Sequence, residues 1–177
     1  MSNVTKQVMV DIETLSVRPY AAILSIGAVA FNVEEGVLDT FYVNVDGQSC
    51  KDVGLHISAD TVEWWSKQSK EARQALTVNP KHISTALLEF KDWFGDDRNT
   101  VIWGNGSAFD ISILESAYWN CDIPIPWSPW KVQCYRTVLN LMGISNKKIR
   151  EAEDDTHHNA LDDAMSQTKT LLKILRS

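Results

Sequence analysis

Apolar runs near the beginning of the chain predict three β-strands. Residues 6–13 and 21–33 are rich in Val, Ile and Ala, and residues 37–45 alternate imperfectly between apolar and polar side chains. The Glu34-Glu35-Gly36 sequence between the last two runs is typical of a turn. Three consecutive strands with short connections indicate an antiparallel meander.

After the third strand, the apolar residues recur mainly at helical spacing. The predicted helices cover residues 63–76, 84–94, 110–119, 135–142 and 158–175. One further apolar strand is expected at residues 100–103, and the Pro- and Trp-rich residues 124–130 are expected to form a loop. The polar residues 145–156 are expected to be mobile.

Length and composition favour one globular domain over residues 1–177. The chain has 44% hydrophobic and 23% charged residues, which is enough apolar material for a sizeable core. Neither a membrane-length apolar run nor a secretory signal is visible, so we expect a cytoplasmic protein without membrane contact. The odd set Cys50, Cys121 and Cys134 has no CxxC pairing, which predicts free thiols rather than a disulfide framework or a zinc knuckle.

The net charge of −6 has the wrong sign for a protein that coats long nucleic acids. It does not exclude a nuclease, because carboxylates gathered around divalent cations contribute much of such a charge, and bound cations reverse the local field. A substrate held at one end also needs few phosphate contacts.

Asp11 and Glu13 form the first candidate site. They lie two residues apart at the end of an apolar strand, where their side chains point to the same face. Paired carboxylates repel each other unless a cation lies between them, and hard divalent cations prefer oxygen ligands. The competing interpretation is a pair of solvated acids at a strand edge.

Asp110 forms the second candidate, directly after a strand, a Gly104-Asn105-Gly106 turn and Phe109. The competing interpretation is a helix cap, since the helix dipole favours Asp in the first turn. The turn lacks the Gly-Lys-Ser/Thr sequence of a phosphate-binding Walker loop.

The third candidate is the segment 156–164, which contains two adjacent histidines and two adjacent aspartates. No cysteine or second histidine cluster lies at a zinc-finger spacing. On the predicted helix, Asp163 shares a flank with small or polar side chains, whereas Asp162 lies on the opposite flank. Helix-cap and solvated-face interpretations stay open for both acids. Taken together, acids from a strand, a strand-to-helix junction and the last helix can meet at one end of a sheet and hold two metal ions.

These residues, in this order, resemble the motifs of the DEDDh exonucleases, which belong to the ribonuclease H-like superfamily. Asp11-Ile-Glu13-Thr14 matches the first motif, Phe109-Asp110 the second, and the segment 158–163 the third, His-x-Ala-x-x-Asp. That spacing selects His158 over His157 and Asp163 over Asp162. The resemblance implies an α/β ribonuclease H-like fold, with a mixed central sheet flanked by helices and with its first three strands antiparallel.

A closer resemblance connects the chain to the branch that contains a mycobacterial 3′→5′ exoribonuclease with phage and bacterial relatives. It is carried by the segments 64–73 and 103–110. Two positions depart from the wider pattern. Gly106 stands where the proofreading-type motif has Asn, and Cys134 stands where relatives often have Asp before the Arg-Thr pair.

The resemblance implies a two-metal 3′→5′ exonuclease that releases nucleoside 5′-monophosphates from single-stranded RNA or DNA with a free 3′ end. Asp11, Glu13, Asp110 and Asp163 would hold two Mg²⁺ or Mn²⁺ ions, and His158 would be the general base. The expected substrate contacts, which include aromatic stacking platforms, are Glu13, Thr14, Leu15, Trp64, Trp65, Trp103, Phe109 and Arg136. For any one tryptophan, core packing is the competing interpretation.

The branch resemblance favours RNA over DNA, a homodimer, and a bacterial cell or a phage-infected host. Two other functions stay open. A catalytically inactive nucleic-acid-binding module would keep the fold without turnover, although the complete acid set argues against it. A metal phosphodiesterase acting on small nucleotides would cleave dinucleotides without shortening a strand.

Overall fold

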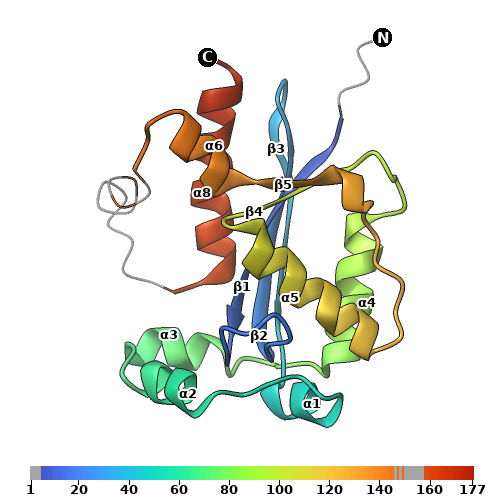
Figure 1. Ribbon diagram of the computed structural model, residues 1–177, viewed down its shortest axis with the longest axis vertical. Helices are drawn as coiled ribbons and strands as arrows, with labels where there is room; N and C mark the ends of the chain where they lie inside the picture. Colours follow the sequence, from blue (N-terminus) through green and yellow to red (C-terminus); the bar gives the residue numbers. More distant parts are fainter. Residues whose placement is uncertain (1–4, 146, 148, 150–157) are drawn as a thin grey trace.

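The computed structural model describes residues 5–145, 147, 149 and 158–177. Its centre is one five-stranded sheet in the order β3-β2-β1-β4-β5 (Figure 1). The strands are β1 (Gln7–Thr14), β2 (Ile23–Asn32), β3 (Gly36–Asn44), β4 (Val101–Gly104) and β5 (Val132–Cys134).

The sheet is mixed, and its direction changes at β1. β1, β2 and β3 form an antiparallel meander, whereas β4 runs parallel to β1, and β5 runs parallel to β4. The prediction of a mixed sheet whose first three strands are antiparallel is confirmed. β5 is not predicted from the pattern, because three residues are too few to establish a period of two.

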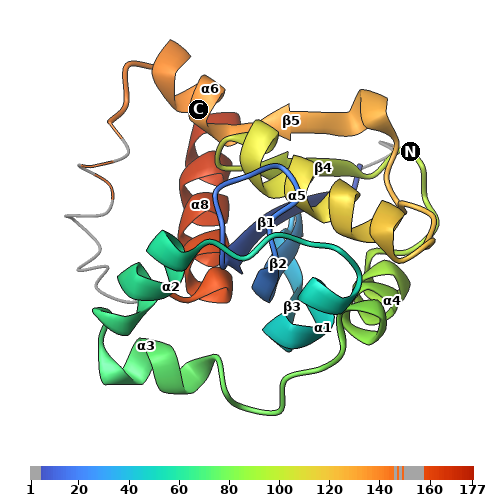
Figure 2. The same ribbon diagram turned by 60° about the horizontal axis from the view of Figure 1, so that its bottom comes forward.

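Helices cover both faces of the sheet (Figures 1 and 2). α6 (Tyr135–Leu141) and α8 (Ala160–Leu175) lie on one face, and α4 (Ile83–Phe94) and α5 (Ser107–Asn120) lie on the other. α1 (Gly47–Asp52), α2 (Ala59–Ser66) and α3 (Lys70–Ala75) gather at one end of the sheet, and the 3₁₀ helix η1 (Pro129–Lys131) precedes β5.

Two helices differ from their predicted extents. The helix predicted over residues 63–76 is instead divided into α2 and α3, because the Ser69 hydroxyl accepts a hydrogen bond from the Ala72 N–H and begins a new helix. α5 begins at Ser107, so Asp110 lies in its first turn and not at its cap. The short helix α1 is not predicted.

Alternation along β1 divides the core into two clusters. Val8, Val10 and Ile12 pack toward α4 and α5, whereas Met9 packs toward α6 and α8. Asp11 and Glu13 follow the odd-numbered positions and therefore face the α8 side. On the opposite face, Trp127 from the predicted loop is fully buried among Phe90, Phe94 and Tyr118.

The segment predicted to be mobile, residues 145–156, falls mostly outside the described residues, as does His157. Within the described part of the chain, no helix is both long enough and apolar enough to cross a membrane. Cys50, Cys121 and Cys134 are all free thiols, as the cysteine pattern predicts.

Candidate active site

The site lies where β1, β4 and the first turns of α5 and α8 come together. Asp11 and Glu13 come from the C-terminal half of β1, beside the end of the parallel strand β4. In open α/β sheets, ligands commonly bind outside the carboxyl ends of the strands. β1 and β4 run parallel, so their carboxyl ends lie at the same end of the sheet.

Asp163 joins these two acids from α8. Asp11, Glu13 and Asp163 each offer an oxygen, and the three oxygens lie within 4.8 Å of one another. Asp163 is buried, whereas the neighbouring Asp162 is exposed. The helix begins just before them, where the Asn159 Oδ1 accepts hydrogen bonds from the Leu161 and Asp162 N–H groups.

Asp110 reaches the same cluster from the first turn of α5. Its side chain is only 4% exposed. Burial raises the pKa of Asp110 to about 7, and the Asp163 charge adds to this rise, while hydrogen bonds from the Ile12 and Asp110 N–H groups and the Arg136 charge oppose it. The Asp110 charge in turn raises the pKa of Asp11, so the two carboxyls are close enough for their charges to repel.

Asp11 is the electrostatic centre of the cluster. Burial raises its pKa well above the usual range, and the charges of Asp110, Asp163 and Glu13 each raise it further. One side chain opposes this rise: the Gln167 Nε2 donates a hydrogen bond of 3.3 Å to the Asp11 Oδ1. Divalent cations fit this oxygen-only donor set, because their charge would offset the mutual repulsion of the acids.

His158 lies immediately before the cap of α8, beside two tryptophans of α2. The imidazole centroid lies 5.0 Å from the Trp64 ring with an interplanar angle of 70°, and 6.3 Å from the Trp65 ring. These edge contacts place the ring against the aromatic surface of α2, one residue before the cap of the helix that carries Asp163.

A pocket of about 450 Å³ opens next to Glu13. Its walls combine apolar side chains with a few hydroxyls and carboxylates; the lining residues are Ile12, Glu13, Thr14, Val17, Ser58, Asp60, Thr61, Trp64, Trp65 and Phe109. Four of the predicted substrate residues besides Glu13 are therefore together: Thr14, Trp64, Trp65 and Phe109. The Trp65 indole is fixed there by a 2.9 Å hydrogen bond to the Thr14 carbonyl.

The other three predicted substrate residues do not line this pocket, and each makes a hydrogen bond within the protein. The Leu15 N–H donates to the Ala22 carbonyl, so that donor is already used. Trp103 is 8% exposed and belongs to the core cluster under α8, where its indole donates to the Gln7 side chain. Arg136 is exposed beside the Gly104–Gly106 turn, and it donates to the Asn105 carbonyl at 2.9 Å.

Two residues of the site had no functional prediction of their own. Gln167 contacts Asp11 from α8, and its position four residues after Asp163 was the available sequence signal. Gly27 lies opposite Asp11 in the register of β1 and β2, and it allows α8 to approach the sheet closely. A single glycine within a strand gives no indication of which helix will lie on it.

Comparison with known proteins gives a match over nearly the whole chain. The family model described as the 3′-5′ exoribonuclease Rv2179c-like domain matches residues 6–175. An exodeoxyribonuclease of Enterobacteria phage T4 is 28% identical over 120 residues, which cover 60% of this chain and 52% of that protein. The chain thus spans about half the length of this curated relative.

Solved structures share the fold. The nuclease domain of 3′hExo, a DEDDh family member bound to rAMP, has a TM-score of 0.67 at 14% identity, over 99% of this chain and 94% of that chain. E. coli Exonuclease I in complex with a dT13 oligonucleotide has a TM-score of 0.69 at 13% identity, over 96% of this chain and 41% of that chain. The likeness confirms the predicted ribonuclease H-like architecture.

Proposed function

Because the chain belongs to the Rv2179c-like 3′-5′ exoribonuclease domain family, we propose that it is a metal-dependent 3′→5′ exonuclease of single-stranded nucleic acid. The observation that carries this proposal is the convergence of four carboxylates from three elements beside a pocket of about 450 Å³. Such a cluster is costly without cations, and the adjoining pocket has room for a terminal nucleotide.

Asp11, Glu13, Asp110 and Asp163 would hold two divalent ions, Mg²⁺ or Mn²⁺, which would supply Lewis-acid stabilisation of charge at the reacting phosphate. The donor set supports this assignment, because all four side chains offer oxygen and because Asp11, Glu13 and Asp163 already present oxygens within 4.8 Å.

The protein's own groups would place the 3′-terminal nucleotide. The apolar walls made by Trp64, Trp65 and Phe109 suit the faces of a base, since every base can stack on an aromatic ring. Glu13 lies on the pocket wall and in the carboxylate cluster, so it can accept a hydrogen bond from the terminal 3′-hydroxyl while the adjacent phosphate lies against the cations that the acids would hold. A free 3′ end is thereby the feature that the site selects.

His158 is proposed as the general base. It would take a proton from water as the water oxygen attacks the terminal phosphorus, while the bond from phosphorus to the upstream 3′-oxygen breaks and that oxygen takes a proton from solvent. The products are a nucleoside 5′-monophosphate and a strand shorter by one residue with a new 3′-hydroxyl. The imidazole lies beside Trp64, which lines the pocket, and five residues before Asp163 in the chain, and this position supports the role.

RNA is proposed as the preferred substrate, on the description of the matching family. The curated phage relative is named an exodeoxyribonuclease, so the preference needs a direct test. We further propose a cytoplasmic homodimer, following the relatives that the motifs resemble; sedimentation of the purified chain tests the dimer.

Matched RNA and DNA oligonucleotides with a 5′ label provide the decisive experiment. With Mg²⁺ or Mn²⁺, a ladder that shortens from the 3′ end is expected, faster on RNA, and it should disappear with Asp11→Ala or with EDTA. A 3′-phosphate on the same strand should block the reaction. Binding without products would instead identify a binding module, and cleavage of a dinucleotide without a ladder would identify a phosphodiesterase of small nucleotides.

A further inference from the structure

Gln167 connects α8 to the carboxylate cluster. It lies one helical turn after Asp163, so the two side chains share the face of α8 that looks toward β1. Its side chain is 6% exposed, and its Nε2 donates to the Asp11 Oδ1 at 3.3 Å, across 156 positions of sequence. The amide therefore links the element that carries Asp163 to the element that carries Asp11.

The chemistry of Asp11 fixes the orientation of this amide. In the ionised form that binds a cation, the Asp11 carboxylate only accepts hydrogen bonds, so the reverse orientation would direct the Gln167 Oε1 at another acceptor. In the observed orientation the Oε1 is buried and has no hydrogen-bond partner among the described residues. A buried acceptor without a partner is destabilising, so a buried Met would be less costly for folding at this position. The benefit of Gln167 must therefore lie in its contact with Asp11.

A neutral donor suits a cation site better than a charged residue does. Lys or Arg beside Asp11 would bring a permanent positive charge that competes with a divalent cation, and Glu would add repulsion to a cluster of four acids. An amide N–H on Oδ1 restrains rotation of the carboxylate and leaves Oδ2 available as a ligand. Groups that orient metal ligands in this way typically change metal affinity by about 10–100-fold when they are removed.

We propose that Gln167 is a positioning residue for cation binding, which holds the Asp11 carboxylate in the orientation that completes the site with Glu13 and Asp163. This inference rests on the proposed function, because it assumes that the carboxylates bind a divalent cation. It goes beyond that function by assigning a role to a side chain that is not itself a ligand.

Titration of the nucleic-acid-free protein with Mn²⁺ by calorimetry tests the proposal. Gln167→Met keeps the length of the side chain and removes the donor; Mn²⁺ affinity should fall by about tenfold. The melting temperature of this variant in EDTA should stay equal or rise, because the unpaired Oε1 is gone. Gln167→Asn provides a second test, since its shorter side chain keeps the amide but withdraws it from Asp11, and the same loss is expected.

Thr168→Val is the matched control. Thr168 follows Gln167 in the chain and is fully buried. The substitution removes only the 2.7 Å hydrogen bond that the Thr168 hydroxyl donates to the Ala164 carbonyl of the same helix. Its melting temperature should fall while its Mn²⁺ affinity stays unchanged. Wild-type affinity in both Gln167 variants would overturn the role of Gln167 and leave the exonuclease proposal intact, whereas absence of Mn²⁺ binding and strand cleavage in the wild-type chain would overturn both.

Discussion

Gly27 lies directly under the backbone of Leu161, at the point where α8 begins. A methyl group at Gly27 would overlap the Leu161 nitrogen and the Ala160 carbonyl. Gly27 also pairs with Asp11 in the register of β1 and β2, so the first turn of α8 rests on the sheet directly beside the acid that it must reach. The absence of a side chain at Gly27 thus sets the separation between Asp163 and Asp11.

Gly27→Ala should displace the start of α8 and lower kcat by about a hundredfold, because shifts near 1 Å have effects of this size on positioned groups. Overpacking should also cost about 1–3 kcal/mol of stability. Leu171→Ala is the control, since it removes buried contacts farther along α8. Its activity per folded molecule should stay near that of the wild type; an equal loss of kcat in both variants would contradict a specific role for Gly27.

Asp110→Asn should stabilise the protein in EDTA at alkaline pH. Burial raises the pKa of Asp110 from 3.8 to about 7, so the native state holds a proton that the unfolded state has already lost between these values. The free energy of unfolding therefore falls as pH rises through this range. Asn does not ionise, so Asp110→Asn should raise the free energy of unfolding at the higher pH by more than about 1.4 kcal/mol relative to the wild type. Chemical unfolding at about pH 5 and about pH 8 measures the difference. A variant less stable than the wild type at the higher pH would refute the expectation.

His158→Ala and Asp11→Asn should affect the enzyme differently. Loss of a general base lowers kcat by about 10²–10⁴-fold without removing a cation ligand. Asp11→Asn removes a charged ligand from the cluster, so both Mn²⁺ affinity and cleavage should fall. Calorimetry and strand cleavage on the same preparations separate the two effects. Loss of cation affinity in His158→Ala would place the imidazole among the ligands instead.

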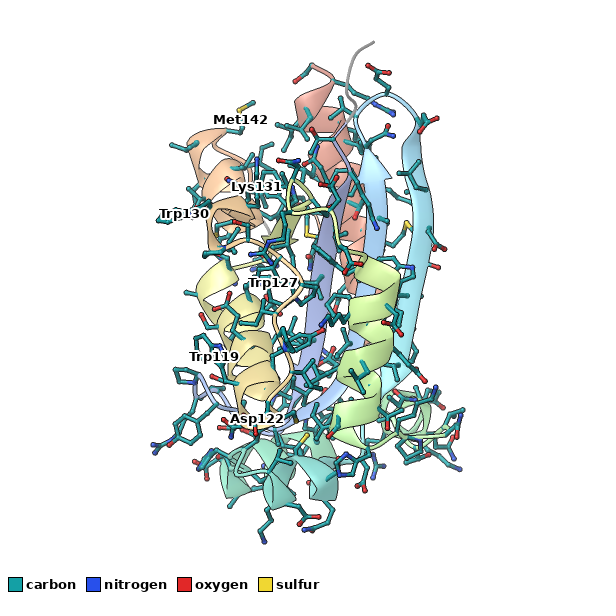
Figure 3. All side chains as sticks on the ribbon, turned by 90° about the vertical axis from the view of Figure 1, so that its right-hand side faces the viewer. Trp119, Asp122, Trp127, Trp130, Lys131 and Met142 are labelled. Carbon is teal, nitrogen blue, oxygen red and sulfur yellow. The ribbon has the colours of Figure 1, made fainter. Side chains whose placement is uncertain are left out.

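Trp64→Ala should raise the KM for an oligonucleotide by about fivefold or more, since stacking of one base on an aromatic ring contributes about 1–3 kcal/mol. Trp64 is 43% exposed and lines the pocket beside Glu13. Trp130 is 87% exposed on η1 and points outward, well away from α2 (Figure 3). Trp130→Ala is therefore the control, with an unchanged KM. Steady-state kinetics decides, and an equal change in both variants would count against stacking at Trp64.

Cys134 should be the most reactive thiol of the chain. Burial raises its pKa, but hydrogen bonds from Thr137 and from the Ser107 and Gly106 N–H groups outweigh burial and bring the pKa to about 7. Burial instead raises the pKa of Cys50 to about 12. Iodoacetamide labelling followed by mass spectrometry should modify Cys134 first, with a rate that rises as pH passes through 7. Faster labelling of Cys50 would contradict this assignment.

Local sequence patterns were enough to predict which face of its strand or helix each acid occupies. The period of a strand places Asp11 and Glu13 on one face, and helical geometry separates Asp163 from Asp162. The structure has Asp163 buried with its oxygen near those of Asp11 and Glu13, and it has Asp162 exposed. The shared face of Asp11 and Glu13 and the different flanks of Asp163 and Asp162 follow from backbone periodicity alone.

Tertiary packing decided the rest. Trp64 and Trp103 were both predicted to contact substrate. Trp64 lines the pocket because α2 lies at the end of the sheet, whereas Trp103 fills the core because β4 lies inside the sheet and is covered by α6 and α8. The raised pKa of Asp110 and the contact of Gln167 with Asp11 depend on segments far apart in the chain. The sequence by itself determined which acids were available and which face of each element they occupy. Only the packing of α5 and α8 against β1 brought those acids together, because burial and Coulomb interactions depend on distances in space and not on separation along the chain.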